Sequence, residues 1–96
     1  GSRMNDQVEE LAEKYISAVE LALMELTPQE PRPEAVNIEI EPVIDAANRY
    51  LTDAKYYLNT EKKATALASV SYAEGLLDAL KILGFVRFEW KRVSRS

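Results

Sequence analysis

The stretch from Ala64 to Gly84, which reads ATALASVSYAEGLLDALKILG, constrains the fold more than any other part of this chain. On a helix of 3.6 residues per turn it forms one apolar stripe. That stripe comprises Ala66, Val70, Ala73, Leu77 and Leu80. A second stripe beside it comprises Tyr72, Leu76, Ala79 and Leu83. Because one neighbour cannot cover this much apolar surface, we expect a helix over residues 62–83 that packs against two others.

Two carboxylates lie on the polar remainder of this helix. Asp78 can pair with Lys81 at the i+3 spacing and stay at the surface. Glu74 precedes Gly75, and a glycine inside a helix costs about 1 kcal/mol relative to alanine. We therefore expect another group to approach the backbone closely at Gly75. Glu74 would then accept a hydrogen bond from Tyr50 or Tyr57, or from a ligand in the same place.

Two further helices are expected on the N-terminal side. Asp6 and Glu9 have the spacing of an N-cap and its reciprocal partner, which predicts a helix over residues 6–26. Leu21 and Met24 fall toward its outer side, and exposed apolar residues of this kind often mark protein interfaces. Pro42 suits the first turn of a second helix over residues 42–59.

The segments between and after the helices are predicted as follows. Prolines at positions 28, 31 and 33 make residues 27–41 a long connection rather than a helix. Thr60 can cap the third helix after a short turn, and Gly84 suits the left-handed position after its end. Phe88 and Trp90 alternate with charged residues, which predicts an extended tail that returns along the helices.

The predicted fold is all-α: a three-helix up-and-down antiparallel bundle with a long proline-rich first connection and an extended C-terminal tail. At 96 residues the chain has room for one hydrophobic core, so we expect a single domain over residues 4–96. Residues 1–3, Gly-Ser-Arg before Met4, resemble the remnant of an expression tag.

Composition removes several classes of function. The chain has no cysteine and no histidine, which excludes thiolate zinc sites, thiol nucleophiles and His-activated nucleophiles. We accordingly expect no cofactor and no metal site. A formal charge of −4 argues against general affinity for nucleic acid, and no apolar run is long enough to span a membrane. The tail has basic residues around Phe88 and Trp90, but the patch is short. We expect a cytoplasmic protein.

Several sequence blocks resemble a known family. These are YLTD at residues 50–53, AKYYL after it, the YAEGLLDAL block at residues 72–80, and a closing FEW. Over about Tyr50 to Trp90 the chain resembles the short archaeal proteins grouped as domain-of-unknown-function family 357. The resemblance implies a compact three-helix bundle and no assigned activity. The chain departs from that pattern at Thr60, Glu61 and Lys62, which replace a Gly-Asp-aromatic turn.

Two functional hypotheses follow. The first is a non-catalytic helical module that acts through protein contact, as an accessory to another protein or as a homodimer. The alternative is a Mg²⁺-dependent nucleotide phosphohydrolase that uses helix carboxylates, since oxygen ligands suit that ion. Its carboxylates would be Glu10, Glu13, Glu74 and Asp78. The candidate residues for a ligand or partner are Glu74, Asp78, Tyr50, Asp53, Tyr57 and Trp90.

Overall fold

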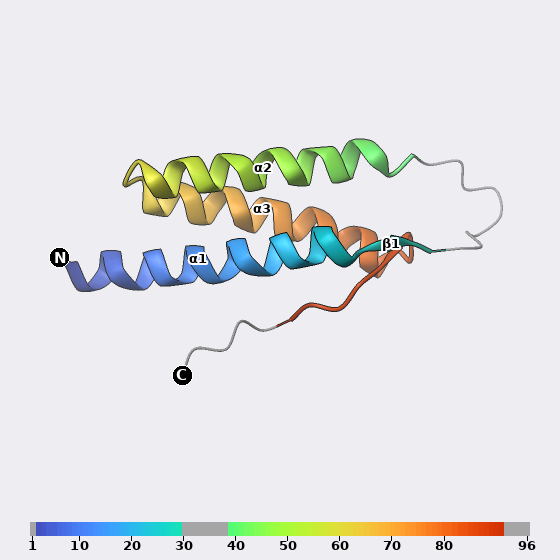
Figure 1. Ribbon diagram of the computed structural model, residues 1–96, viewed down its shortest axis with the longest axis horizontal. Coiled ribbons are helices and arrows are strands. Elements are labelled where there is room, and N and C mark those ends of the chain that lie inside the picture. The colour runs from blue at the N-terminus through green and yellow to red at the C-terminus, as the bar shows by residue number, and fades with distance from the viewer. Residues whose placement is uncertain (1, 30–38, 92–96) are drawn as a thin grey trace.

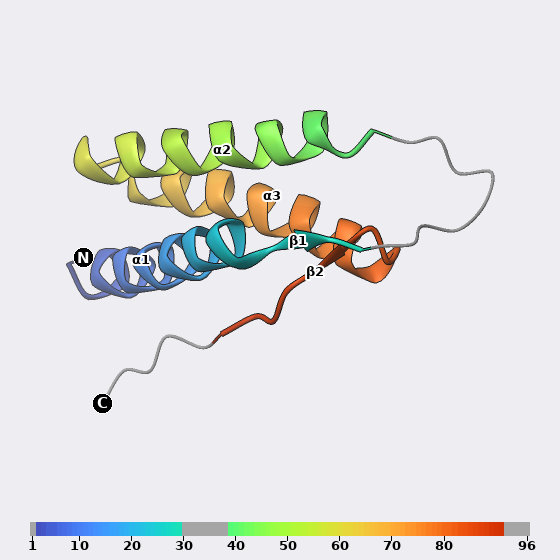
Figure 2. The same ribbon diagram turned by 45° about the vertical axis from the view of Figure 1, so that its right-hand side comes forward.

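Three helices run up, down and up along one long axis in the computed structural model, which describes residues 2–29 and 39–91. The helices are α1 (Ser2–Glu25), α2 (Glu41–Asn59) and α3 (Lys63–Ile82), and two short strands are β1 (Thr27–Pro28) and β2 (Val86–Arg87). Figures 1 and 2 show α3 between α1 and α2, with the C-terminal segment on the α1 side. The predicted all-α three-helix bundle is confirmed, and the short two-stranded pairing is an addition to it.

Helix α3 is the central element, because it packs against both α1 and α2. Its buried residues are Ala66, Val70, Ala73, Leu77 and Leu80, which is the first apolar stripe predicted from the sequence. In the second stripe Leu76 packs against the core, but Tyr72 is 53% and Leu83 is 63% exposed, so this stripe was wrong as a continuous packing face. The alanines in the first stripe let the two neighbouring helices approach closely.

The neighbouring helices complete the core with a mixture of small and branched side chains. From α1 these are Ala12, Ile16, Val19 and Ala22, and from α2 they are Ala47, Leu51 and Ala54. Ile16 and Leu51 widen the buried faces of α1 and α2, because each of these helices contacts α3 and, to a lesser extent, the other.

The ends of α1 differ from the prediction. The helix begins at Ser2, so Asp6 lies inside it and is not its N-cap. Nothing in residues 2–5 opposes a helix, because that stretch contains neither proline nor glycine. After α1, Thr27 pairs with Arg87 and Pro28 with Val86 in an antiparallel register.

The connection is anchored at both ends. The backbone N–H of Gln29 donates a hydrogen bond to the Phe85 carbonyl at 2.9 Å. Ile40 is buried just before α2, and Pro42 occupies the first turn of that helix as predicted. Most of the predicted connection, residues 30–38, lies outside the described residues.

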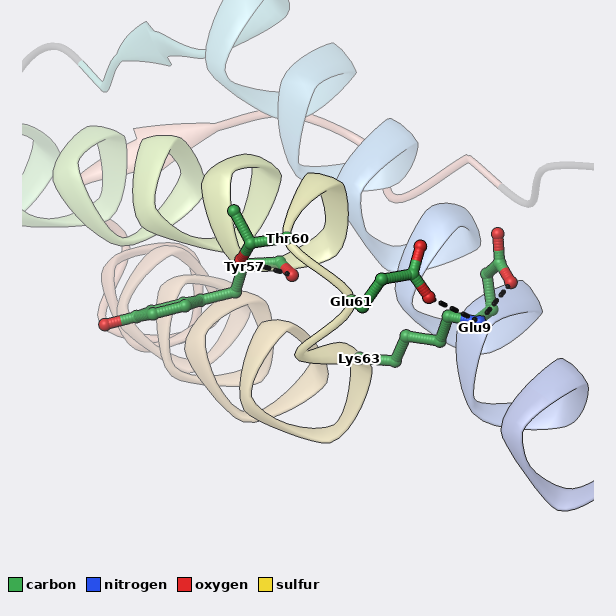
Figure 3. Close-up of polar contacts among 5 residues, drawn as sticks. All are labelled: Glu9, Tyr57, Thr60, Glu61 and Lys63. Carbon is green, nitrogen blue, oxygen red and sulfur yellow. Dashed lines mark hydrogen bonds and ion pairs between the residues drawn. The ribbon is translucent and has the colours of Figure 1, made fainter. Parts of the chain in front are cut away.

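The turn between α2 and α3 is held by side-chain contacts (Figure 3). The Thr60 hydroxyl donates to the carbonyls of Tyr56 and Tyr57 at 3.1 and 3.2 Å. Thr60 therefore ends α2, and the prediction that it caps α3 was wrong: Lys62 occupies that position. Glu61 has a φ of 65°, a left-handed conformation that favours glycine.

Lys63 ties this turn to α1. Its ammonium lies 3.0 Å from the Glu9 carboxylate and 3.4 Å from that of Glu61 (Figure 3). The hydrogen bond with Glu9 is the main cause that raises the pKa of Lys63 above its usual value. Both acidic partners are solvent-accessible, so we assign this cluster a positioning role more than a stabilising one.

The end of α3 reverses the chain toward α1. Gly84 has a φ of +83°, the left-handed position predicted for it. The N–H of Phe85 donates to the Leu80 carbonyl at 2.9 Å, which closes the turn. Phe85, Val86 and Phe88 are then buried. The predicted extended tail is confirmed as far as Lys91. No helix in the described residues is long and apolar enough to cross a membrane.

Candidate functional site

An open groove runs between α1 and α2, which each pack mainly on α3 and less on each other. Its wider part has a volume of about 690 Å³. The residues that line this part are Ser17, Glu20, Leu21, Leu23, Met24, Asn48 and Leu51. A narrower part continues toward the α2–α3 turn and is lined by Glu13, Ile16, Ser17, Lys55, Leu58 and Asn59. Because Ser17 lines both parts, we treat them as one surface, the α1–α2 groove.

The wide part of the groove is the more apolar. Met24 is 79% exposed, and Leu21 and Leu23 are half-buried beside it. The sequence placed Leu21 and Met24 on the outer side of the first helix, and both now line the same hollow. An exposed methionine next to leucines is a common feature of adaptable protein-binding surfaces.

Charged groups edge this surface. The Lys55 ammonium pairs with the Glu20 carboxylate across the two helices. Glu13 is exposed in the narrow part. The edge of the groove therefore carries two carboxylates and one ammonium, and the Lys55 ammonium is already paired with Glu20. A ligand with positive charge beside an apolar surface would match this edge.

Sequence reasoning missed most of this groove. Leu51 and Asn48 were absent from its candidate residues, although Ile44, Leu51 and Leu58 recur every seven residues along α2. That spacing is the signal for a second helix-facing line on α2. No sequence pattern indicated that the groove is open, because this depends on how far apart α1 and α2 lie.

A second polar site lies where the tail meets α3. The Trp90 indole N–H donates to the Asp78 carboxylate at 2.9 Å, and both groups are partly buried. The Lys91 ammonium lies 2.7 Å from the Glu25 carboxylate of α1. The tail therefore spans the space between α1 and α3. Asp78 and Trp90, two of the predicted candidates, are brought together here to fix the tail.

The expected Asp78–Lys81 pair is replaced by other contacts. The Lys81 ammonium lies over the Phe88 ring, 5.2 Å from its centroid. Phe88 and Trp90 pack edge to face, with centroids 4.8 Å apart. Asp78 and Lys81 therefore contact Trp90 and Phe88 of the tail rather than each other, because these aromatic rings occupy the same surface of α3.

Glu74 lies one turn before Asp78 and is half-buried. Burial, followed by the negative charge of Asp78, raises its pKa above the usual 4.5. The hydrogen bond predicted from Tyr50 or Tyr57 is absent among the described residues. The reason for expecting it was also wrong, since a Cβ added at Gly75 would meet nothing within 4 Å.

Among the described residues, no hydrogen bond, ion pair or ring contact joins the candidates on α2 to Glu74 or Asp78. Tyr50 packs edge to face on Tyr72 of α3, with centroids 4.4 Å apart. Tyr57 packs in the same manner on Tyr56 at 5.5 Å. Asp53 is exposed beside a shallow hollow on α2. The six predicted candidates therefore do not form a single site.

The carboxylates of the magnesium hypothesis do not converge either. Within residues 2–29 and 39–91, no three acidic side chains form a group that could hold a metal ion. The phosphohydrolase hypothesis needs Glu10, Glu13, Glu74 and Asp78 at one site, and the structure does not support such a site. The basic residues of the tail are partly occupied, since Arg87 donates to Gln29 at 3.0 Å. Arg92 and Arg95 lie outside the described residues.

Comparison with known proteins gives one match. Residues 14–86 match the sequence model of a family described as protein of unknown function (DUF357). The matched range begins within α1, earlier than the resemblance over Tyr50 to Trp90, and it ends before Trp90. No curated protein and no solved structure matches the chain.

Proposed function

The chain belongs to the DUF357 family of proteins of unknown function, and from that premise we propose that it is a non-catalytic protein-interaction module. In this proposal, the α1–α2 groove binds a short amphipathic helix of a partner protein. The observation that carries the proposal is the 79% exposure of Met24 beside half-buried leucines in an open groove. Helices that dock in grooves of this kind insert apolar side chains at i, i+3/i+4 and i+7.

The length of the groove sets the length of its ligand. Along α1 it extends from Glu13 to Met24. At 1.5 Å per residue this is roughly 17 Å, which corresponds to about three turns of a bound helix. A partner helix of this length would place two or three apolar side chains against Leu21, Leu23 and Met24.

The charge of the groove sets the flanks of its ligand. Glu13 and Glu20 edge the groove, and the chain has a formal charge of −4. Lysine or arginine beside the apolar stripe of the partner would gain from these carboxylates, and acidic flanks would be repelled. The proposed ligand is therefore a basic amphipathic helix.

The proposal is tested with two synthetic helical peptides of about 14 residues. They share one leucine stripe, and one has lysine flanks while the other has glutamate flanks. We expect fluorescence anisotropy to show binding of the lysine-flanked peptide and at least tenfold weaker binding of the glutamate-flanked one. Leu21→Glu should weaken the lysine-flanked complex at least tenfold.

The matched control is Ala68→Glu on the exposed side of α3, which adds the same charge elsewhere. It should leave peptide binding unchanged. Equal loss in both variants would show that the peptide responds to net charge alone, and the groove would then not be the binding site.

A further inference from the structure

The outward line of α3 carries no charge, and most of it is left uncovered by the described residues; Tyr72 packs against the ring of Tyr50 at one edge. The line comprises Ala64, Ala68, Tyr72, Gly75, Ala79 and Leu83, which are all exposed. We refer to these six residues as the α3 face. They lie opposite the buried stripe, and α2 and the tail lie to either side. Tyr72 and Leu83 expose 53% and 63% of their surface, and neighbouring Ile82 exposes 76%. The most exposed line of a surface helix is normally its most polar one.

Gly75 at the centre of this face has no explanation within one chain. A glycine inside a helix costs about 1 kcal/mol relative to alanine. A Cβ at this position would meet nothing within 4 Å, so packing inside the chain does not require the missing side chain. Open space above a mid-helix glycine leaves room for a side chain from another molecule to approach the backbone closely.

The order of residues along the α3 face indicates that the partner is a second copy of this chain. If a second α3 packs antiparallel about a two-fold axis between Tyr72 and Gly75, residue i faces residue 147 − i. Tyr72 then faces Gly75, Leu83 faces Ala64, and Ala68 faces Ala79. Every large side chain meets a small one, so the face is complementary to itself, as an isologous interface must be.

We propose that two copies of this chain associate through their α3 faces, antiparallel, with Tyr72 of each copy seated over Gly75 of the other. This proposal is independent of the α1–α2 groove, which lies on a different side of the bundle. The lack of charge on the face matters, because two chains of formal charge −4 repel one another elsewhere.

The small area of the contact is typical of a weak dimer. Helix α3 has 20 residues and is about 30 Å long. Packing along one helix face would bury roughly 800 Å² in total, which is below the range of stable interfaces and within that of transient ones. We therefore expect dissociation constants of about 10 μM to 1 mM.

The test is sedimentation equilibrium of the full chain from about 5 μM to 1 mM. The wild type should show a monomer–dimer equilibrium. Gly75→Leu should weaken the dimer at least tenfold by filling the space for Tyr72, while thermal unfolding in dilute solution shows the monomer intact. Ala68→Glu should also weaken it at least tenfold by placing a charge in the interface.

A charge pair tests the register. Because position 68 faces position 79 of the other copy, Ala68→Glu combined with Ala79→Lys should restore association to within about threefold of the wild type. A parallel pairing would place like charges together, so failure of the double variant to dimerise would overturn the antiparallel arrangement. A wild type that stays monomeric to 1 mM, or a dimer lost in Leu21→Glu and retained in Ala68→Glu, would overturn the α3 interface.

Discussion

Leu77→Ala is the substitution that most severely tests the role of α3. Leu77 is fully buried at the middle of the helix, between the residues contributed by α1 and α2. Truncation to alanine removes three carbons, which at about 0.8 kcal/mol per carbon is roughly 2.4 kcal/mol of lost transfer free energy. The two flanking helices limit how far the site can collapse, so a cavity remains. We expect a total cost of about 3–4 kcal/mol.

Leu83→Ala provides the matched control. It deletes the same three carbons from the same segment, but Leu83 is 63% exposed. We expect a cost below about 1 kcal/mol. Both variants would be measured by urea unfolding followed by circular dichroism, at about 1 μM, where the proposed dimer is largely dissociated. Similar losses in the two variants would refute the assignment of one buried stripe on α3.

Three further predictions concern the tail, the turn and Glu74. Asp78→Ala removes the acceptor for the indole N–H of Trp90, the single tryptophan of the chain, so its emission should shift to longer wavelength; an unchanged spectrum would show that this hydrogen bond does not hold the tail. Glu61→Gly relieves a left-handed φ of 65° and should raise the free energy of unfolding by about 0.5–1 kcal/mol, whereas a loss would mean that the exposed Glu61–Lys63 pair outweighs backbone strain. Glu74 has a raised pKa in the folded state, so the folded protein binds more protons than the unfolded one, and stability falls as pH rises from about 4.5 through that pKa. Glu74→Gln should remove this fall. The free energy of unfolding would be measured at several pH values, and the same dependence on pH in both proteins would contradict the prediction.

The helices were predictable because their signals are local. The stripe from Ala66 to Leu80 follows from periodicity, and Gly84 follows from the left-handed φ that a helix end requires. The start of α1 was missed because an N-cap motif at Asp6 competes with helix propensity before it, and propensity continued the helix to Ser2.

The contacts between distant segments were harder to predict. The sequence showed that Trp90 belongs to an extended tail, but the hydrogen bond to Asp78 depends on where that tail returns along α3. The sequence also suggested a hydrogen bond to Glu74 from a tyrosine of the second helix. The open space at Gly75 removes the reason for expecting that bond. The α1–α2 groove depends on the separation of two helices, which no single residue encodes.

A chemical-shift map of the ¹⁵N-labelled protein with the lysine-flanked peptide tests the central claim most directly. In the Ala68→Glu variant, in which the α3 dimer is weakened, the account predicts the largest shifts at Ser17, Leu21, Met24, Asn48 and Leu51 on both sides of the groove. Small shifts are predicted along α3. Shifts that concentrate instead on the α3 face or on the tail around Trp90, with the groove unchanged, would contradict it.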